Sequence, residues 1–513
     1  MFSLAPVHTT EDAKSSAVPG AGPQPDISRR LLFSVLLTAA FAAVAFFGLL
    51  HHEMWRNEIQ AWLIARDSTS LIDLCKNLKY ENHPCLWYLC LIPLTRIFAD
   101  PFAMGIMHIS IASCAVFVFA RFAPFTNLQK ILFAFGYYSL FEYGIISRGY
   151  ELGNLFLFTF CALYAMPRRN YLLLFGALSL LANTSICGTI IALALAGALL
   201  FCRVTKYDTA AQGKYMLPAI LLFCSALVLA VAQMMPASDG FHGYSLHSDP
   251  GFRAIFGRAL FAAVGTAMGY LPIPCDGLYF YGSSIFGQSK VLYWLACICA
   301  VSFTAAFAYG LRKHTPFLIA YLLGMVGLVG FSAVFSFGYV WHFGQQFMLL
   351  IACLWLAGQA LGQGKNGFLT ALLAVQSLVG AYAYAMDFSY PFSQCREAAN
   401  YIQKDPQLSK LPIAGFPDFA MSPLCAWLKR PMYFLQSESM GTYVAWNGKR
   451  KHALEVDREA ALLNFAKRTG SFLLVQSGPC TMHSKVLTVT PISSFTGSIV
   501  SAEDCYLYLI EKN

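Results

Sequence analysis

The sequence predicts an all-α polytopic membrane protein that carries a small α/β domain at its C-terminal end. Of its 513 residues, 57% are hydrophobic and only 12% are charged, whereas soluble domains carry about 25% charged residues. Most of the chain must therefore lie in lipid. After residue 386, short β-rich runs alternate with helical patterns, which is typical of a small α/β domain.

Eleven apolar stretches approach the length that a membrane-spanning helix needs, about 20 residues. They are 31–50, 102–120, 129–147, 152–166, 171–185, 186–202, 215–234, 291–311, 316–336, 343–361 and 368–386. Two further stretches, 85–98 and 254–274, would invert the orientation of every later loop if they crossed the membrane. We therefore expect both to be interfacial or re-entrant helices on the outer side.

The basic residues between these stretches indicate the orientation. Residues 1–28 are polar and rich in Ala, Pro and Ser, which predicts a disordered cytosolic tail. With that tail inside, the cytosolic turns hold Arg121, Lys130, Arg168, Arg169, Arg203, Lys206, Lys214, Arg312, Lys313 and Lys365, as the positive-inside rule requires. The net charge of +9 then needs no nucleic-acid partner. A transmembrane domain would cover 29–386, with a large outer loop at 51–101, and an outer domain would cover 387–513.

The cysteine and histidine patterns predict no metal site. None of the sixteen cysteines has zinc-site spacing. Cys480 and Cys505 lie in the polar C-terminal region and could pair outside the cytosol, although sequence alone cannot assign the pairing. His51-His52-Glu53 holds metal-ligating residue types, but no D-x-D or H-E-x-x-H motif accompanies it, so a divalent metal is not expected.

The outer loop begins with the stretch MWRNEIQAW, which predicts an amphipathic helix over 54–66. Trp55, Ile59 and Trp62 share one face at helical spacing and are expected to lie at the lipid–water interface. Glu58 would then be held at headgroup depth, where charged groups are costly and usually functional. The alternative is a solvated polar face with arginines that reach out to water, and the loop by itself favours neither interpretation.

A second cluster of charged residues follows the third expected span, in LFEYGIISRGYELG at 140–153. Glu142 interrupts the apolar run, and Arg148, Tyr150 and Glu151 follow it. One interpretation is a second carboxylate with a phosphate-binding arginine, since the guanidinium group can bind two phosphate oxygens at once. The other is a local Glu–Arg pair that closes helix ends. His342, at an outer helix end, is either a polar site residue or an interface histidine.

These motifs resemble those of the polyprenyl-phosphate-sugar-dependent glycosyltransferases of the GT-C fold, related to glycosyltransferase family 39. That group includes the protein O-mannosyltransferases and the bacterial transferases that add aminoarabinose to lipid A. The resemblance covers most of 30–386. Asn57-Glu58 stands at the family's acidic pair, NHPCLWY at 82–88 leads into its juxtamembrane helix, and 142–153 matches its second charged turn. It implies a GT-C-like fold in a bacterial inner membrane, with a cytoplasmic N-terminus and a periplasmic C-terminal domain.

One position departs from the family pattern. The family usually has Asp-Glu where this chain has Asn57-Glu58, and the aspartate is commonly the proposed base. Asparagine cannot take a proton at neutral pH. Glu58 takes over that role, or Glu142 does, or the protein is catalytically weak.

The resemblance implies transfer of a sugar from a polyprenyl-phosphate donor to a glycan, lipid or protein acceptor, with inversion and with no further cofactor. Catalytic candidates are Glu58, Glu142 and Asn57, with Glu58 as the general base. Candidates for neutralising the leaving phosphate or binding substrate are His83, Arg148, Tyr150, Arg56, Lys79 and His342.

Two other classes remain open. A transporter or lipid flippase would place charges at mid-bilayer on broken helices and often shows repeated halves. In this chain the charges lie at outer loop ends, and 31–200 shows no repeat in 215–386. An inactive membrane scaffold is the third class, and Asn57 is the residue that suggests it.

Overall fold

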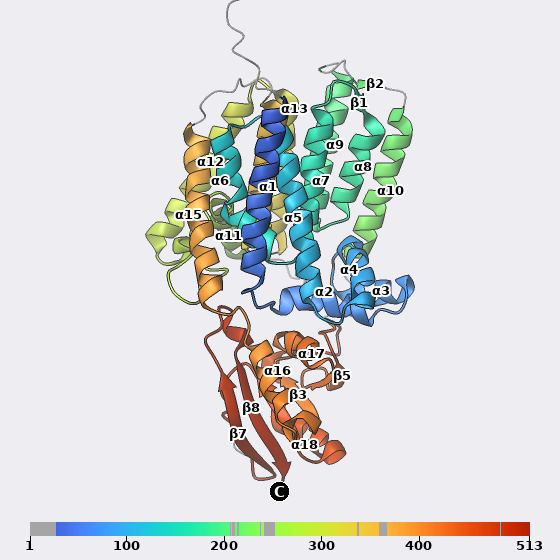
Figure 1. The fold of residues 1–513 in the computed structure, drawn as a ribbon, viewed down its shortest axis with the longest axis vertical. Helices are drawn as coiled ribbons and strands as arrows, with labels where there is room; N and C mark the ends of the chain where they lie inside the picture. The colour runs from blue at the N-terminus through green and yellow to red at the C-terminus, as the bar shows by residue number, and fades with distance from the viewer. Residues whose placement is uncertain are drawn as a thin grey trace, which may run out of the picture.

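A computed structural model of the chain shows a helical bundle stacked on a smaller domain with a β-sheet (Figure 1). It describes residues 27–513 except 206, 208–210, 213–214, 236, 241–251, 336–337, 359–366 and 483. The expected cytosolic tail lies almost wholly outside the described residues.

The bundle confirms a multi-pass membrane protein. Eight helices among the described residues are long and apolar enough to cross a membrane. They are α1 (Ile27–Leu49), α5 (Phe102–Phe122), α9 (Ile186–Val204), α10 (Met216–Met234), α12 (Lys290–Leu311), α13 (Thr315–Phe335), α14 (Val340–Ala357) and α15 (Gly367–Ser389). Each corresponds to one of the eleven expected spans.

The other three expected spans form shorter or interrupted helices. The stretch 129–147 divides into α6 (Asn127–Ala134) and the π-helix η2 (Tyr137–Ile145). The stretches 152–166 and 171–185 form α7 (Gly149–Tyr164) and α8 (Tyr171–Ala182). All four pack within the bundle (Figure 1), and the total of eleven crossings stays a prediction.

The two stretches expected to be interfacial or re-entrant do not form simple spans. The first is α4 (Leu86–Ile97), which has 12 residues and contains Pro93. It lies with α2 (Arg56–Asp67) and α3 (Leu71–Asn77) between the bundle and the C-terminal domain (Figure 1). We call this side of the bundle the domain face.

The second stretch is α11 (Phe252–Tyr270), which enters the bundle from the domain face. Arg258 donates a hydrogen bond to the carbonyl of Val334 near the end of α13, whereas the hydroxyl of Tyr270 contacts that of Tyr321 deeper in the bundle. A short turn joins α12 to α13, so α12 begins on the face where α13 ends. The chain from α11 to α12 thus enters and leaves on one side, as a re-entrant segment does.

The C-terminal domain has a six-stranded mixed sheet in the order β5-β4-β3-β6-β8-β7. Its strands are β3 (Ile413–Phe416), β4 (Met432–Phe434), β5 (Ser439–Gly441), β6 (Phe472–Gln476), β7 (Leu487–Phe495) and β8 (Cys505–Lys512), and its helices are α16 (Cys395–Lys404), α17 (Ser422–Leu428) and α18 (Arg458–Thr469). Strand β3 is parallel to both β4 and β6, whereas β8 is antiparallel to both its neighbours. The small α/β domain expected after residue 386 is therefore confirmed.

The remaining elements are short. A two-residue pair, β1 (Arg169–Asn170) and β2 (Ala211–Gln212), lies on the far side of the bundle from the C-terminal domain (Figure 1). The single-turn helices are η1 (Leu78–Tyr80), η4 (Ile285–Gly287), η5 (Leu408–Lys410), η6 (Asp418–Ala420), η7 (Ala453–Glu455) and η8 (Ser501–Glu503).

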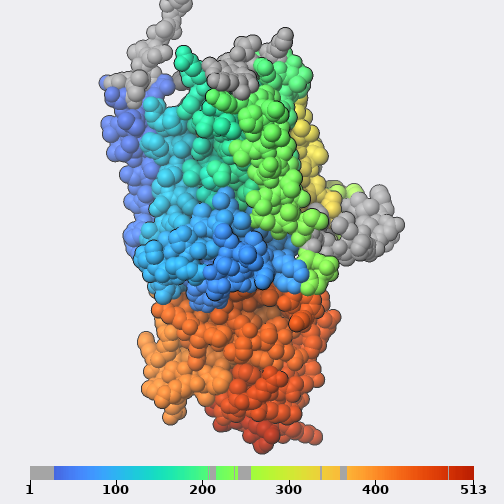
Figure 2. Space-filling model, turned by 90° about the vertical axis from the view of Figure 1, so that its right-hand side faces the viewer, coloured from blue at the N-terminus to red at the C-terminus, as the bar shows by residue number. Residues whose placement is uncertain are grey.

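The aromatic face of α2 packs against protein and not against lipid. Trp55 is 2% exposed and Trp62 is fully buried. Trp62 and Ile59 share a hydrophobic cluster with α16 and α17, and α2 packs directly on α17. Figure 2 shows the blue segment that contains α2 seated on the orange C-terminal domain. Trp55, at the start of the helix, packs instead against the rings of Tyr281 and Trp341. The expectation that these side chains lie at the lipid–water interface was therefore wrong, because other parts of the protein cover them.

The structure also places a cysteine pair that the sequence could not assign. The Sγ atoms of Cys395 and Cys505 lie 3.5 Å apart in the buried interior of the C-terminal domain. The backbone N–H of Cys480, by contrast, donates to the hydroxyl of Tyr508. Cys395, and not Cys480, is therefore the neighbour of Cys505.

We predict that Cys395 and Cys505 form a disulfide if the domain faces an oxidising compartment, because disulfides persist there and are rare in the cytosol. Peptide mapping of protein alkylated without reductant, taken directly from membranes, should recover the 395–505 cross-link and an alkylated Cys480. Full alkylation of Cys395 and Cys505 under these conditions would contradict the prediction.

Candidate functional site

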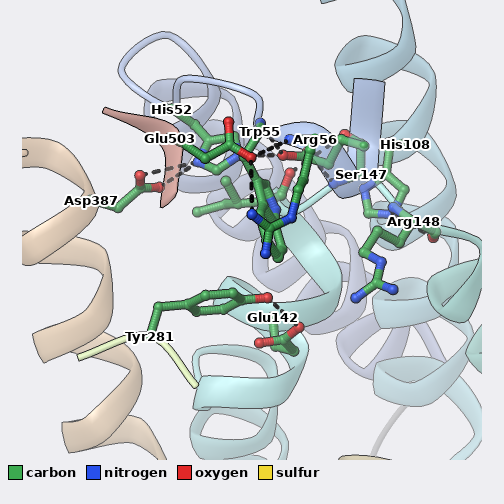
Figure 3. A network of polar contacts seen from close by, with 12 residues as sticks. His52, Trp55, Arg56, His108, Glu142, Ser147, Arg148, Tyr281, Asp387 and Glu503 are labelled. Carbon is green, nitrogen blue, oxygen red and sulfur yellow. Dashed lines mark hydrogen bonds and ion pairs between the residues drawn. The ribbon is translucent and has the colours of Figure 1, made fainter. Parts of the chain in front are cut away.

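Three ionisable side chains, two from the start of the outer loop and one from the end of α15, meet at the domain face and form what we call the His52 triad: His52, Glu58 and Asp387. His52 follows α1, Glu58 lies in the first turn of α2, and Asp387 lies in the last turn of α15. The Nδ1 atom of His52 is 2.9 Å from Oδ2 of Asp387, and its Nε2 atom is 2.9 Å from Oε2 of Glu58 (Figure 3). All three side chains are buried.

The charges of the triad favour a protonated histidine. Burial opposes a charge on His52, but the carboxylates of Asp387 and Glu58 outweigh it and raise the pKa of His52 well above its ordinary value of 6.5. Both ring nitrogens face carboxylate oxygens, so both donate hydrogen bonds in the imidazolium form.

Glu58 is fully engaged by the protein. Its Oε1 atom accepts a hydrogen bond from the backbone N–H of Ser147 at 2.7 Å, and its Oε2 atom accepts from the backbone N–H of Trp55 at 3.3 Å as well as from His52. The side chain has no exposed surface. Glu58 therefore joins the start of α2 to the turn that follows η2, which makes it a positioning group for the residues of that turn.

Glu142 is the second buried carboxylate of the site. It lies in the π-helix η2, and each carboxylate oxygen accepts one hydrogen bond from a tyrosine hydroxyl: Oε2 from Tyr137 and Oε1 from Tyr281, both at 3.2 Å. Figure 3 shows Tyr281 reaching Glu142 from a separate segment of the chain. Among the described residues, the hydrogen-bond partners of Glu142 are these two hydroxyl groups, which exchange readily with a substrate hydroxyl.

Arg148 provides an incompletely bonded guanidinium group. It lies over the rings of Trp341 and Tyr150, 4.3 and 5.0 Å from their centroids, and its Nη1 atom is buried without a hydrogen-bond partner among the described residues. The ring of His108 bridges the turn: its Nε2 atom lies 3.2 Å from the backbone N and 3.1 Å from the carbonyl oxygen of Arg148, and its Nδ1 atom lies 3.3 Å from the carbonyl oxygen of Gly144. Stacking on aromatic rings leaves the edge of a guanidinium group available to an anion.

Two histidines flank this arginine. The backbone N–H of Tyr339 donates to Nδ1 of His342, so a neutral His342 carries its proton on Nε2 and donates it to the hydroxyl of Tyr150 at 3.0 Å. Burial and the neighbouring charge of Arg148 lower the pKa of His83 to about 4. His83 is therefore neutral at physiological pH and serves as a hydrogen-bonding group and not as a second cation.

The structure brings together most of the residues that the sequence singled out, but not all. Asn57 is half-buried beside Glu58 on α2. The backbone N–H of Arg56 donates to Oε1 of Glu503, and its guanidinium lies over Phe419 of the C-terminal domain. Lys79 lies apart from the site, because it is exposed and pairs with Asp239 at 2.9 Å.

Sequence reasoning missed several residues of the site, among them His52, Asp387, Tyr137, Tyr281 and Glu503. Asp387 directly follows the last apolar run, and an acid at the end of a membrane span is a detectable signal for function. Tyr281 and Glu503 lie in segments of ordinary composition, so nothing in the sequence distinguishes them.

Among the described residues, no group of three or more His, Cys, Asp or Glu side chains is arranged to hold a metal ion. No protein-family model, curated protein or solved structure matches this chain. The arrangement of the site is therefore the basis for any functional assignment.

We predict that His52→Ala destabilises the folded protein by about 3–5 kcal/mol near pH 6, because it leaves two buried carboxylates without their cation. The folded-state pKa of His52 is raised, so its stabilising contribution is complete below pH 6.5 and is lost as the pH rises through the folded-state value. Thermal unfolding of purified protein in detergent, measured from pH 6 upward, should show the two proteins converging at alkaline pH.

The neighbouring His51→Ala is the matched control, because His51 is exposed. It should change stability little and without this pH trend. A His52→Ala penalty that is constant across the pH range would contradict a charged His52.

A second prediction concerns Glu503. Burial raises the pKa of its carboxyl group from 4.5 to about 7, although the nearby Arg56 acts in the opposite direction. The folded state then holds a proton that the unfolded state has released, so this group lowers stability as the pH rises from 4.5 to 7. Glu503→Gln should stabilise the protein at pH 8 by up to about 3 kcal/mol and have little effect at pH 4.5. The exposed Glu511→Gln is the control in the same unfolding assay, and a loss of stability in Glu503→Gln at pH 8 would contradict the prediction.

Proposed function

We propose that this protein is an integral-membrane glycosyltransferase that moves a sugar, with inversion, from a polyprenyl-phosphate donor to a glycan, lipid or protein acceptor. The observation that carries the proposal is the aromatic-stacked Arg148, with its unpartnered guanidinium nitrogen, at the end of the bundle where a lipid-borne phosphate would lie. The buried carboxylate of Glu142 interacts electrostatically with it.

Arg148 binds the donor phosphate in this proposal. Negative charge grows on the phosphate as the bond to the sugar breaks, and a guanidinium already in place stabilises that charge without reorganising. Neutral His83 and the hydroxyl of Tyr150, which His342 orients, supply further hydrogen bonds to donor oxygens. Because His83 is neutral, it adds no second positive charge beside Arg148 that would bind the product phosphate more tightly.

Glu142 acts as the general base. An acceptor hydroxyl attacks the anomeric carbon from the face opposite the phosphate, the carbon–oxygen bond to phosphate breaks, and the hydroxyl proton passes to Glu142. Glu58, whose oxygens are occupied by Ser147, Trp55 and His52, is a positioning residue that fixes the turn carrying Arg148. Asn57, which cannot serve as a base, is suited to bind a sugar hydroxyl.

The proposal includes the membrane arrangement inferred from the sequence: a GT-C-like fold with eleven crossings, a cytoplasmic N-terminus and a periplasmic C-terminal domain in a bacterial inner membrane. The described basic residues Arg121, Arg169, Arg203 and Arg312 support this orientation, because they lie at helix ends away from the domain face.

We predict that purified protein in lipid consumes one member of a panel of radiolabelled polyprenyl-phosphate sugars when a crude envelope extract supplies acceptors. Glu142→Gln should lower turnover by about 10²–10⁴-fold, because it removes the proton acceptor. Arg148→Gln should lower it by about 10²–10³-fold, because it removes charge stabilisation at the phosphate.

Glu397→Gln and Arg468→Gln are the matched controls, since both side chains are exposed in the C-terminal domain. Both should retain wild-type turnover, and all variants should be compared at equal folded fractions. Normal turnover by Glu142→Gln would remove Glu142 as the base. If wild type consumes no donor, the transferase proposal fails, and flux assays in proteoliposomes would then test a transporter.

A further inference from the structure

A cavity of about 640 Å³ opens between the membrane bundle and the C-terminal domain, at the opposite end of α2 from Glu58. Three helices end at it: α2 at Asp67, α4 at Ile97 and α17 at Leu428. Its polar lining is Arg66, Asp67, Thr95, Arg96, Lys429, Arg430 and Thr442. Glu58 and Arg66 are eight residues apart on one helix, about 12 Å, so this cavity is separate from the candidate functional site.

The charges around the cavity do not cancel. The lining contains one acidic residue, Asp67, and Arg66 donates two hydrogen bonds to it, of 2.6 and 3.1 Å. Arg96 donates to the carbonyls of Arg66 and Ser68 at the end of α2, which satisfies these free carbonyl groups. Because its partners are neutral, the positive charge of Arg96 is not cancelled. With Lys429 and Arg430, the lining keeps a net charge of about +3 by simple charge counting.

One cation in the lining is incompletely bonded. Arg430 donates from Nη1 to the carbonyl of Ser409 at 2.9 Å, whereas its Nη2 atom is buried with no hydrogen-bond partner among the described residues. Lys429, next to it, holds the left-handed conformation, with φ of 55°, at the end of α17. A buried donor without a partner lowers stability, and an anion in the cavity could accept its hydrogen bond.

The cavity lies at headgroup depth. Its residues 95–99 come directly before α5, which begins the second candidate span at Phe102. Beside the cations, Ile97 is 73% exposed and Phe98 is 49% exposed. Cations next to exposed apolar side chains at the end of a membrane span match a lipid, whose phosphate is anionic and whose chains are apolar.

We propose that this cavity binds the phosphate group of an anionic membrane phospholipid. Arg430 and Lys429 contact the phosphate oxygens, Arg96 and Arg66 contribute charge, and Ile97 and Phe98 contact the acyl chains. Free phosphate offers the same oxygens but gains nothing from the apolar rim, so the lipid is the better ligand. The site is independent of the transferase proposal, since it shares no residue with it.

The test is native mass spectrometry of full-length protein released from nanodiscs that contain phosphatidylglycerol and phosphatidylcholine. Wild type should retain one more phosphatidylglycerol than the double variant Lys429→Gln/Arg430→Gln. The matched control is Lys467→Gln/Arg468→Gln, which removes an adjacent Lys-Arg pair from an exposed part of α18 and should retain lipid as wild type does.

Two results would overturn the proposal. One is equal retention of phosphatidylglycerol by wild type and the 429/430 variant, when both show the same unfolding midpoint in phosphatidylcholine. The other is loss of the retained lipid on addition of millimolar inorganic phosphate, which would assign the cavity to a free anion. If the 429/430 variant unfolds early, Lys429→Gln alone should still lower retention, because Lys429 is exposed and makes little contribution to packing.

Discussion

The hydrogen-bonded His52 triad is the interaction on which the arrangement of this protein depends. His52 leaves the first membrane helix and Asp387 ends the last, so one imidazole ring closes the bundle across 335 residues of sequence. Its other nitrogen holds Glu58, and Glu58 in turn holds the backbone of Ser147 beside Arg148. Replacing either carboxylate would leave the histidine charge only half compensated in a buried position, which couples the closure of the bundle to the geometry of the candidate site.

The membrane class and much of the C-terminal domain could be predicted from the sequence, because apolar length and alternating periodicity are local properties. Which part of the molecule an apolar face packs against is not a local property of the sequence, because it depends on the tertiary structure. Trp55 and Trp62 have the spacing of an interfacial helix, but in the structure Trp62 packs with the C-terminal domain and Trp55 with the rings of Tyr281 and Trp341. The break between α6 and η2 is not visible in the sequence either. Hydropathy is continuous over this stretch, so it does not show the interruption at Phe135 and Gly136.

Individual site residues were predictable where a charge stands out against an apolar background. Glu58, Glu142 and Arg148 do so, and the structure places them on neighbouring segments of the domain face (Figure 3). Their roles were not predictable, because a role depends on partners. Glu58 has its oxygens filled by backbone donors and a histidine, whereas Glu142 holds two exchangeable hydroxyls, and both hydroxyls come from residues that no local pattern marks.

Helix α14 has a consequence for how the chain is assembled in the membrane. Every residue in it is buried, and it has the lowest mean hydropathy of the eight candidate spans. Lipid alone would therefore hold it poorly during insertion, particularly near His342, Gln345 and Gln346. The elements that pack most extensively on it, α7, α11 and α13, all precede it in the chain. Synthesis from the N-terminus thus completes the groove that receives α14 before the ribosome makes that helix, and its polar side chains can move from the translocon into protein without crossing lipid.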